Sequence, residues 1–178
     1  MSRYESLSAQ EHRQRAPGQV ACAVVTVSDT RTLADDRSGA TIIELLEGAG
    51  HHVTARMIVP DEPSVLEPAV RDLAGRAEVD AVLITGGTGI AARDQTPDAI
   101  AGMLTKALPG YGELFRMLSY QEIGAAAMLS RAVGGLIGQT VVLVMPGSTA
   151  AVRLAMEKLI LPELGHLVEH AQRWPPRR

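Results

Sequence analysis

The chain has 178 residues, of which 46% are hydrophobic and 21% charged, and its formal net charge is -3. This composition is typical of one globular domain with its own core. The net negative charge, an aromatic content of only 3% and the lack of a basic patch with interleaved aromatics argue against a nucleic-acid partner. No apolar run approaches the roughly 18 residues of a membrane span.

The chain termini differ in character from the segment between them. Residues 1–19 are polar and have no apolar signal-peptide core, so we expect a flexible arm and a cytoplasmic location. Residues 20–170 are expected to form a single domain, followed by a flexible tail at 171–178. Cys22, the only cysteine, lies in the apolar run VACAVVTV. It cannot form an intramolecular disulfide, and we expect it to be a buried core residue.

Continuous apolar runs rich in β-branched residues predict buried strands at 20–27, 79–85 and 140–145. The run at 51–59 alternates more and is predicted to lie nearer an edge. Segment 131–145 adds a hairpin with its turn near Gly138-Gln139, so one strand is expected to run antiparallel.

Helical spacing of apolar residues predicts helices between these strands. Ser38 is the expected N-cap of the first, whose apolar face is made of Ile42, Ile43, Leu46 and Ala49. In the second, Pro63 stands early, and Pro68 is expected to delay or kink the helix. Pro162 is expected to separate two helices near the C-terminus. Alternating strands and helices predict a three-layer α/β sandwich with a mostly parallel central sheet and helices on both faces.

Polar or glycine-containing loops follow three of the predicted strands: SDTR (28–31), GGTG (86–89) and PGST (146–149). The carboxyl ends of parallel strands meet at one edge, where open α/β sheets bind ligands. PGST also leads into a helix whose free N–H groups can hold an anion. We therefore expect a polyanion site, although each loop alone could be an ordinary turn. The candidate phosphate-binding residues are Ser28, Asp29, Gly86, Gly87, Thr88, Gly89, Pro146, Gly147 and Ser148.

Two known nucleotide motifs fit the glycine loop poorly. GGTGIAAR lacks the lysine of a P-loop. GTGIAA matches a dinucleotide fingerprint, which would indicate a nicotinamide-dependent dehydrogenase, but that fingerprint should open a helix directly. Here Pro97 would fall within the first turns, and Thr96 or Asp94 is better placed to cap a new helix beginning at Pro97.

Two acids lie beside these loops. Asp61 follows the second strand in VPDEP, and Asp94 follows the glycines in RDQTPD. Carboxylates near a phosphate site make chemical sense if a divalent cation joins them, and oxygen ligands suit Mg²⁺. The alternative is that Asp61 caps the helix at Pro63 and Asp94 the helix at Pro97. No zinc site is expected, because the only paired spacing assigned to the five histidines is that of His51 and His52, at the start of a strand.

Five motifs in order, TVSDTR, VLITGGTGIAARDQTPDA, GYGELFRMLSYQEIG, AMLSRAVGG and MPGSTAAV, closely resemble the MoaB/MogA family of molybdenum cofactor biosynthesis. Its fold recurs in the G domain of gephyrin, and the resemblance covers about residues 20–168. It implies adenylylation of molybdopterin by Mg-ATP, with Asp61 and Asp94 at the positions tied to catalysis. It also implies pterin or phosphate contacts at Ser130 and Arg131, although a structural ion pair is an equal alternative for Arg131.

The wording of the motifs is closer to the MoaB branch than to the MogA branch. Relatives of MogA usually carry a proline where this chain has Thr149, so a carrier that binds molybdopterin without turnover is the competing hypothesis. The family habit also implies a homotrimer or homohexamer, and a possible hand-over of the pterin to other proteins of the pathway. Phe115, Met117 and Leu118 are expected to pack between helices or subunits. The choice between molybdenum and tungsten stays open.

Overall fold

The central layer of this computed structural model, which describes residues 17–172, is a six-stranded sheet in the order β2-β1-β3-β6-β5-β4. Four strands run parallel to one another: β1 (Ala21–Val27), β2 (His52–Val59), β3 (Ala81–Thr85) and β6 (Thr140–Met145). Strand β5 (Val133–Ile137) runs antiparallel to β6 and to the two-residue edge strand β4 (Lys106–Ala107). The predicted strands and the single antiparallel hairpin are confirmed, whereas β4 was not predicted.

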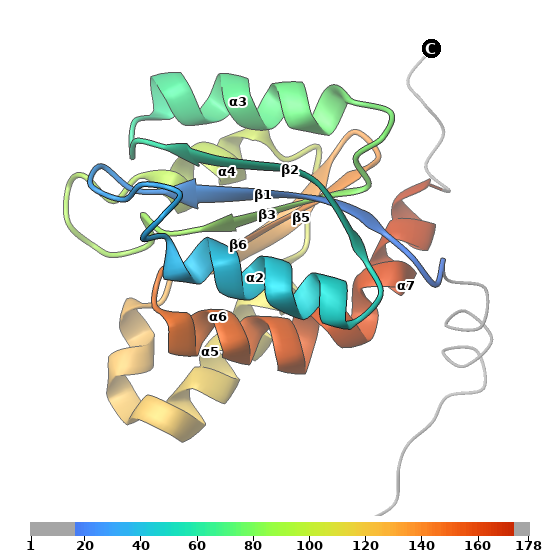
Figure 1. Ribbon diagram of the computed structural model, residues 1–178. Helices are drawn as coiled ribbons and strands as arrows, with labels where there is room; N and C mark the ends of the chain where they lie inside the picture. Colours follow the sequence, from blue (N-terminus) through green and yellow to red (C-terminus); the bar gives the residue numbers. More distant parts are fainter. Residues whose placement is uncertain (1–16, 173–178) are drawn as a thin grey trace, which may run out of the picture.

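Helices cover both faces of this sheet (Figure 1). One face carries α3 (Pro63–Gly75) and α4 (Thr96–Met103). The other carries α2 (Arg37–Gly48), α5 (Pro109–Ile123), α6 (Thr149–Ala155) and α7 (Leu161–Gln172). The predicted three-layer α/β sandwich is confirmed. Within residues 17–172, no helix combines the length and apolar character needed to cross a membrane.

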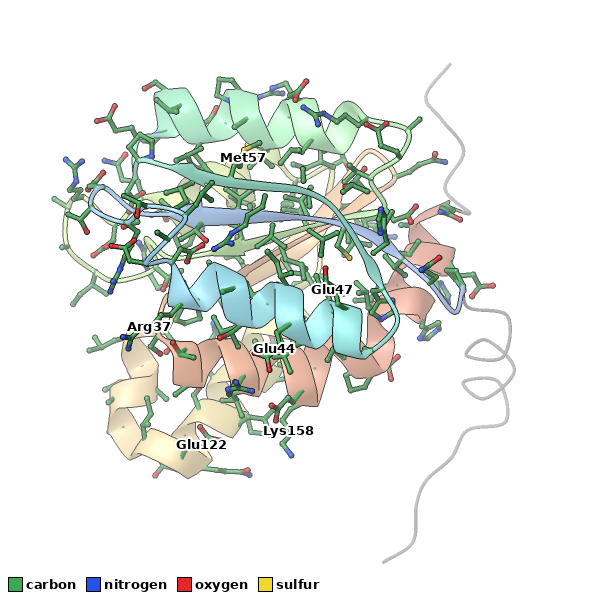
Figure 2. All side chains as sticks on the ribbon, viewed as in Figure 1. Arg37, Glu44, Glu47, Met57, Glu122 and Lys158 are labelled. Carbon is green, nitrogen blue, oxygen red and sulfur yellow. The ribbon has the colours of Figure 1, made fainter. Side chains whose placement is uncertain are left out.

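The central strands are apolar throughout because their side chains alternate between two cores. In β1, Cys22 and Val24 belong to the core under α2 and α6, whereas Ala23 and Val25 belong to the core under α3. Cys22 is fully buried, as predicted, and burial raises the pKa of its thiol to about 12. Strand β2 lies at the sheet edge, as predicted, and most of its residues are half-buried. In Figure 2, Met57 of β2 lies beneath α3, whereas Glu44 and Lys158 project outward.

Neither Pro68 nor Pro162 delays or ends a helix. Helix α3 begins at Pro63 and continues through Pro68, which occupies an exposed position. Pro162 does not separate two helices, because α6 and α7 join through the π-helical segment η2 (Met156–Ile160), and Leu161 keeps helical backbone angles. The Leu161 N–H donates to Met156 O, five residues earlier, so the helical hydrogen-bond ladder is already shifted where Pro162, which has no N–H to donate, stands.

The N-terminus of α2 is also different from the prediction. Asp36, and not Ser38, is the N-cap: its Oδ1 accepts from Gly39 N at 2.8 Å, and Ser38 Oγ donates to the same oxygen at 3.1 Å. Ile42 and Leu46 are buried as expected, but Ala49 is exposed beyond the end of the helix.

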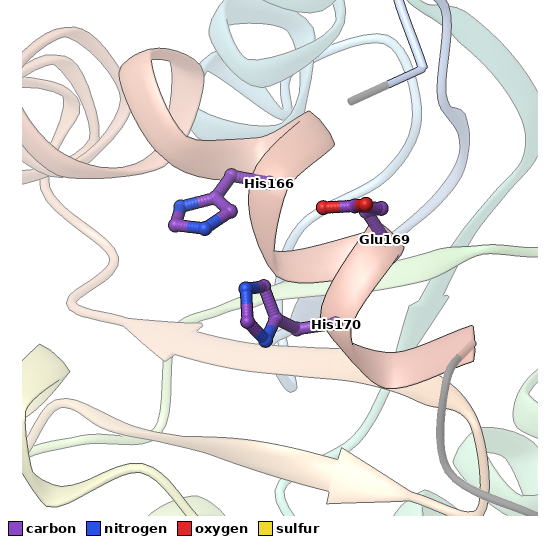
Figure 3. A group of neighbouring side chains, drawn as sticks. All are labelled: His166, Glu169 and His170. Atoms are coloured by element: carbon purple, nitrogen blue, oxygen red, sulfur yellow. The ribbon is translucent and has the colours of Figure 1, made fainter. Parts of the chain in front are cut away.

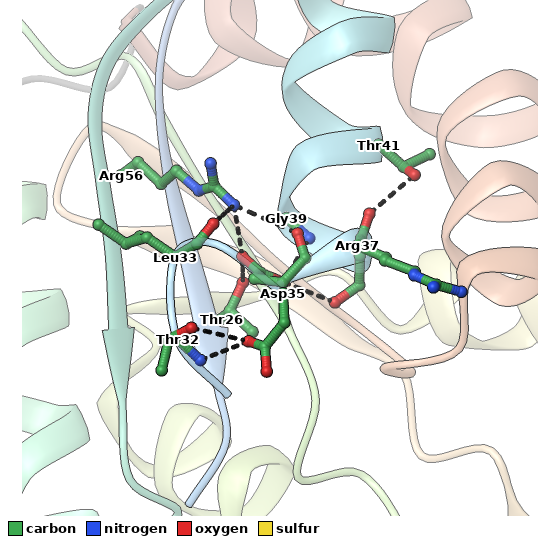
Figure 4. A network of polar contacts seen from close by, with 10 residues as sticks. Thr26, Thr32, Leu33, Asp35, Arg37, Gly39, Thr41 and Arg56 are labelled. Atoms are coloured by element: carbon green, nitrogen blue, oxygen red, sulfur yellow. Dashed lines mark hydrogen bonds and ion pairs between the residues drawn. The ribbon is translucent and has the colours of Figure 1, made fainter. Parts of the chain in front are cut away.

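A buried polar network holds this cap in place (Figure 4). Asp36 Oδ2 accepts from Thr26 Oγ1 at 2.9 Å and pairs with Arg56 Nη2 at 3.0 Å, while the Asp36 side chain is fully shielded from water. Burial alone would raise the pKa of Asp36, but hydrogen bonds from Gly39, Arg56, Thr26 and Ser38 outweigh burial and lower it. The network fixes the loop between β1 and α2, which carries the first group of candidate site residues.

We expect Asp36→Ala to lower the free energy of unfolding by about 2 to 4 kcal/mol, because it removes a helix cap and the carboxylate that pairs with Arg56. Asp36 has a lowered pKa, so its contribution is present above the unfolded-state value of about 4 and is lost as pH falls through the folded-state value. Urea unfolding of wild type and variant between pH 3 and 7 measures both effects. Asp72→Ala, which removes an exposed pair with Arg76, is the matched control and should change little.

Candidate functional site

The predicted loops do meet at the carboxyl edge of the parallel strands (Figure 1). Ser28 N donates to Val59 O at 2.8 Å, which ties the end of β1 to the end of β2. Gly86 N donates to Met145 O at 3.2 Å, and Thr85 Oγ1 donates to Pro146 O at 3.1 Å, which ties the end of β3 to the end of β6. The candidate residues therefore lie along one continuous edge.

The glycine loop is shaped by contacts with the two candidate acids. Gly86 and Gly87 adopt positive φ angles of 104° and 61°, which favour glycine. A Cβ on Gly87 would overlap the Asp61 carboxylate and Thr96 Oγ1, and a Cβ on Gly89 would lie 2.5 Å from Asp94 Oδ2. Gly87 and Gly89 therefore make room for the acids of the protein itself, which the sequence had not suggested.

Asp61 is the buried member of the pair, with 7% of its surface exposed. It does not cap α3, whose N-cap is Glu62. Its Oδ1 instead accepts from Gln95 N at 3.4 Å and from Thr96 Oγ1 at 3.2 Å, at the start of α4. Burial raises the pKa of Asp61, the hydrogen bonds from Gln95 and Thr96 oppose this, and the charges of Asp94 and Asp29 add to the rise.

Asp94 lies in a tight turn before α4. Its Oδ2 accepts from Ala91 N at 3.0 Å, and its own N–H donates to Ala91 O at 2.9 Å. It does not cap α4, which begins at Thr96 with Gln95 as N-cap and no side-chain cap. The capping alternatives for Asp61 and Asp94 on their own following helices are therefore wrong. GTGIAA does not open a helix either, which speaks against a dinucleotide fingerprint.

Asp29 and Arg93 form an exposed ion pair that bridges the first loop and the glycine loop. The other oxygen of Asp29, Oδ1, accepts from Asp61 N at 3.2 Å. The hydrogen bond from Arg93 is the main cause of the lowered pKa of Asp29. Arg93 was not a predicted site residue, and only its place inside the RDQTPD motif could have suggested it.

Arg131, which precedes β5, binds the backbone of the glycine loop and of the residues that follow it. Its Nε donates to Gly89 O at 2.8 Å and Thr88 O at 3.3 Å, its Nη2 donates to Asp94 O, and its Nη1 pairs with Asp98 at 2.7 Å. Three carbonyl groups of one loop thus depend on one guanidinium. The structural ion pair expected as an alternative for Arg131 is therefore present, with Asp98. The same side chain also binds the backbone of the candidate site.

The third loop ends in a capped helix, as expected. Ser148 is the N-cap of α6, and its Oγ accepts from Ala151 N at 3.2 Å. Thr149 is the first residue of α6, a position where proline is also tolerated. Gly147 packs close to the Gly86 backbone, since a Cβ there would lie 3.2 Å from Gly86 Cα. In the first loop, Ser28 Oγ accepts from Arg31 N at 3.2 Å and stabilises the turn.

Comparison with known proteins assigns the chain to a family. Residues 23–166 match the family described as "Probable molybdopterin binding domain". Molybdenum cofactor biosynthesis protein B of Bacillus anthracis is 56% identical over 164 residues, which cover 90% of this chain and 96% of the relative. The chain belongs to the MoaB family. The predicted resemblance, and its closeness to the MoaB branch, are confirmed.

Solved structures extend this agreement to the fold of the MoaB family. A crystal structure of molybdenum cofactor biosynthesis protein B has a TM-score of 0.87 and 53% identity, and the match covers 90% of this chain and 100% of that one. The tungsten cofactor synthesizing protein MoaB from Pyrococcus furiosus has a TM-score of 0.75 and 36% identity, with 89% and 100% covered.

We expect Gly87→Ala to destabilise the protein by about 1 kcal/mol or more from the left-handed backbone alone, with a further loss from overlap with Asp61. Gly102→Ala is the matched control: nothing lies within 4 Å of its Cβ position in α4, so it should be neutral or stabilising by up to about 1 kcal/mol. Thermal unfolding of both variants measures the difference. Equal stability of the two would contradict the tight packing described for this loop.

Proposed function

We propose that the protein adenylylates molybdopterin with Mg-ATP, producing molybdopterin-AMP and pyrophosphate. The observation that carries the proposal is the pair of acids at the edge of the sheet: Asp61 is buried beside the glycine loop, and this burial, with a smaller contribution from the charge of Asp94, raises the pKa of Asp61. A buried carboxylate near a like charge is costly unless a cation is bound there. Membership of the molybdenum cofactor biosynthesis family supplies the substrate class.

The acids fit a magnesium ion bound together with a nucleotide. Mg²⁺ in nucleotide sites takes one or two carboxylates and completes its shell with phosphate oxygens and water. Asp61 and Asp94 supply two carboxylates, and Asp61 Oδ2 makes none of the hydrogen bonds that fix Oδ1. When bound, Mg²⁺ would neutralise charge on the phosphates during transfer.

The remaining work is positioning, which the chain's own residues can perform. The glycine loop would let backbone N–H groups approach the triphosphate, and the free N–H groups at the start of α6 would face the phosphate of the pterin. An oxygen of the molybdopterin phosphate would attack the α-phosphorus of ATP, and the bond from that phosphorus to the bridging oxygen would break. Pyrophosphate leaves with the electron pair, so no acid–base residue is needed.

A carrier that binds molybdopterin without turnover is the second candidate. The observation that favours it is Thr149, which stands at the position where relatives of MogA usually carry proline. At the first position of α6, either residue fits the backbone, since Ser148 has extended angles of φ -75° and ψ 140°. Thr149→Pro should therefore fold normally and test whether loop stiffness limits turnover.

We expect Asp94→Asn to reduce formation of molybdopterin-AMP by at least about 100-fold, because it removes a charge while keeping the acceptor for Ala91 N–H. The assay contains purified protein, molybdopterin, ATP and Mg²⁺, and measures molybdopterin-AMP and pyrophosphate. Asp61→Asn should have the same effect, and both variants should still bind molybdopterin.

Asp72→Asn on the outside of α3 is the matched control and should retain full turnover. Product that depends on Mg²⁺ and on both acids would establish the enzyme. Molybdopterin binding without product in the wild-type protein would instead establish the carrier.

We further propose that the protein is a homotrimer or homohexamer. Most of the large exposed apolar side chains gather on α5 and the following 3-10 segment η1 (Gly124–Leu129). They are Leu114, Met117, Tyr120, Ile123, Met128 and Leu129. Such a patch is typical of a contact between subunits. Phe115, by contrast, is fully buried within the subunit.

We expect the double variant Met117→Glu, Met128→Glu to lower the mass in solution to that of a monomer, since it places charges in the apolar patch. Light scattering after gel filtration measures the mass. Val65→Glu, at an exposed apolar position on α3, is the control and should leave the assembly intact. A wild-type monomer, or a double variant with unchanged mass, would exclude this surface as the interface.

The proposed setting is cytoplasmic, with hand-over of the pterin to other proteins of the pathway and no nucleic-acid or membrane partner. The reaction is the same for a molybdenum or a tungsten cofactor, because the metal enters after adenylylation.

A further inference from the structure

We propose that α7 carries a transition-metal site, with His166, Glu169 and His170 as protein ligands and Zn²⁺ as the ion that suits them best (Figure 3). Each of the three side chains offers a ligand atom, and these atoms lie within 4.8 Å of one another. Among the described residues, no other group of three or more His, Cys, Asp or Glu side chains converges in this way.

The helix itself brings the two imidazoles together. His166 and His170 are spaced i, i+4, so their side chains leave the same face one turn apart. Their ring centroids are 4.6 Å apart with the planes at 76°. Zinc bonds to nitrogen and oxygen measure about 2.0–2.2 Å, which places tetrahedral ligand atoms roughly 3.4 Å apart. Small side-chain rotations would close the remaining gap. His170 is exposed and lines a cavity of about 190 Å³ beside β4 and β5.

A fourth residue supports His166 in the way that metal-binding histidines usually need. His166 Nδ1 lies 2.9 Å from Glu163 Oε2, one turn earlier in the helix. A carboxylate that accepts from one ring nitrogen leaves the lone pair on the other and makes the ring a stronger ligand. Glu163 is therefore the positioning residue, and His166, Glu169 and His170 are the ligands.

The ligand chemistry selects the class of ion. Two imidazole nitrogens with one carboxylate suit Zn²⁺, with Ni²⁺ and Cu²⁺ as competitors, whereas Mg²⁺ and Ca²⁺ prefer oxygen ligands alone. A dication is also favoured near the C-terminal end of a helix, where the carbonyl groups carry partial negative charge. The ion would join successive turns at the end of α7. This helix lies at the opposite end of the sheet from the glycine loops, so the ion would stabilise the fold and take no part in adenylylation (Figure 1).

The spacing was present in the sequence, as His166-Leu-Val-Glu-His170. The prediction of no zinc site rested on His51 and His52 and overlooked it.

Calorimetric titration of untagged, chelator-treated protein with ZnCl₂ tests the site, and thermal unfolding with and without Zn²⁺ gives an independent readout. We expect one ion per chain at this site and a zinc-dependent rise in the unfolding temperature. His170→Gln should weaken binding at least about tenfold and abolish the rise, and Glu163→Gln should weaken it less. His52→Gln, an exposed histidine on β2, is the matched control and should bind as wild type.

Equal zinc affinity in wild type and His170→Gln would overturn the proposal, as would the absence of binding in wild type. Circular dichroism of the His170→Gln variant checks that it is folded. Since His170 is exposed, its replacement should not disturb the core. MgCl₂ is the control ion: whatever binding or stabilisation it gives should be the same in wild type and His170→Gln, because Mg²⁺ prefers oxygen ligands.

Discussion

The burial of Asp61 at the meeting point of several loops is the constraint on which the candidate site depends. Its backbone N–H is bound by Asp29, its carboxylate accepts from the start of α4, and Gly87 can pass over it only without a side chain. One residue therefore links the ends of β1, β2 and β3. A charge in this position stabilises the loops through hydrogen bonds, and it also leaves an electrostatic demand that a bound cation would meet.

The parallel strands were predictable because both their faces are buried, and strands of this kind are unbroken apolar runs in the sequence. Caps and prolines were harder, since their outcome depends on distant partners. Asp36 displaced Ser38 as the cap of α2 because Thr26 and Arg56, both remote in sequence, complete its hydrogen bonding. A π turn precedes Pro162, and the spacing of apolar residues in the sequence does not predict it.

The candidate site also has features that the sequence predicts and features that depend on distant partners. The loops, glycines and acids could be placed at one edge because each follows a predicted parallel strand, and the carboxyl ends of parallel strands meet at the same edge. The sequence could not reveal that Thr96 binds Asp61, that Arg93 pairs with Asp29, or that Arg131 binds three carbonyl groups between β3 and α4. These contacts join residues separated by more than thirty positions, so only the folded sheet brings them together. The geometry also changed the interpretation of the glycines, which first accommodate the protein's own carboxylates.

The buried thiol of Cys22 makes the protein well suited to spectroscopic labelling. Cys22 is the only cysteine in the chain, and at neutral pH its raised pKa leaves almost none of the reactive thiolate. A cysteine introduced on the surface would then be the single site that maleimide dyes modify. Ile90, which is exposed next to the glycine loop, offers such a position. A fluorophore there would report on movements of the loop without any need to remove native cysteines first.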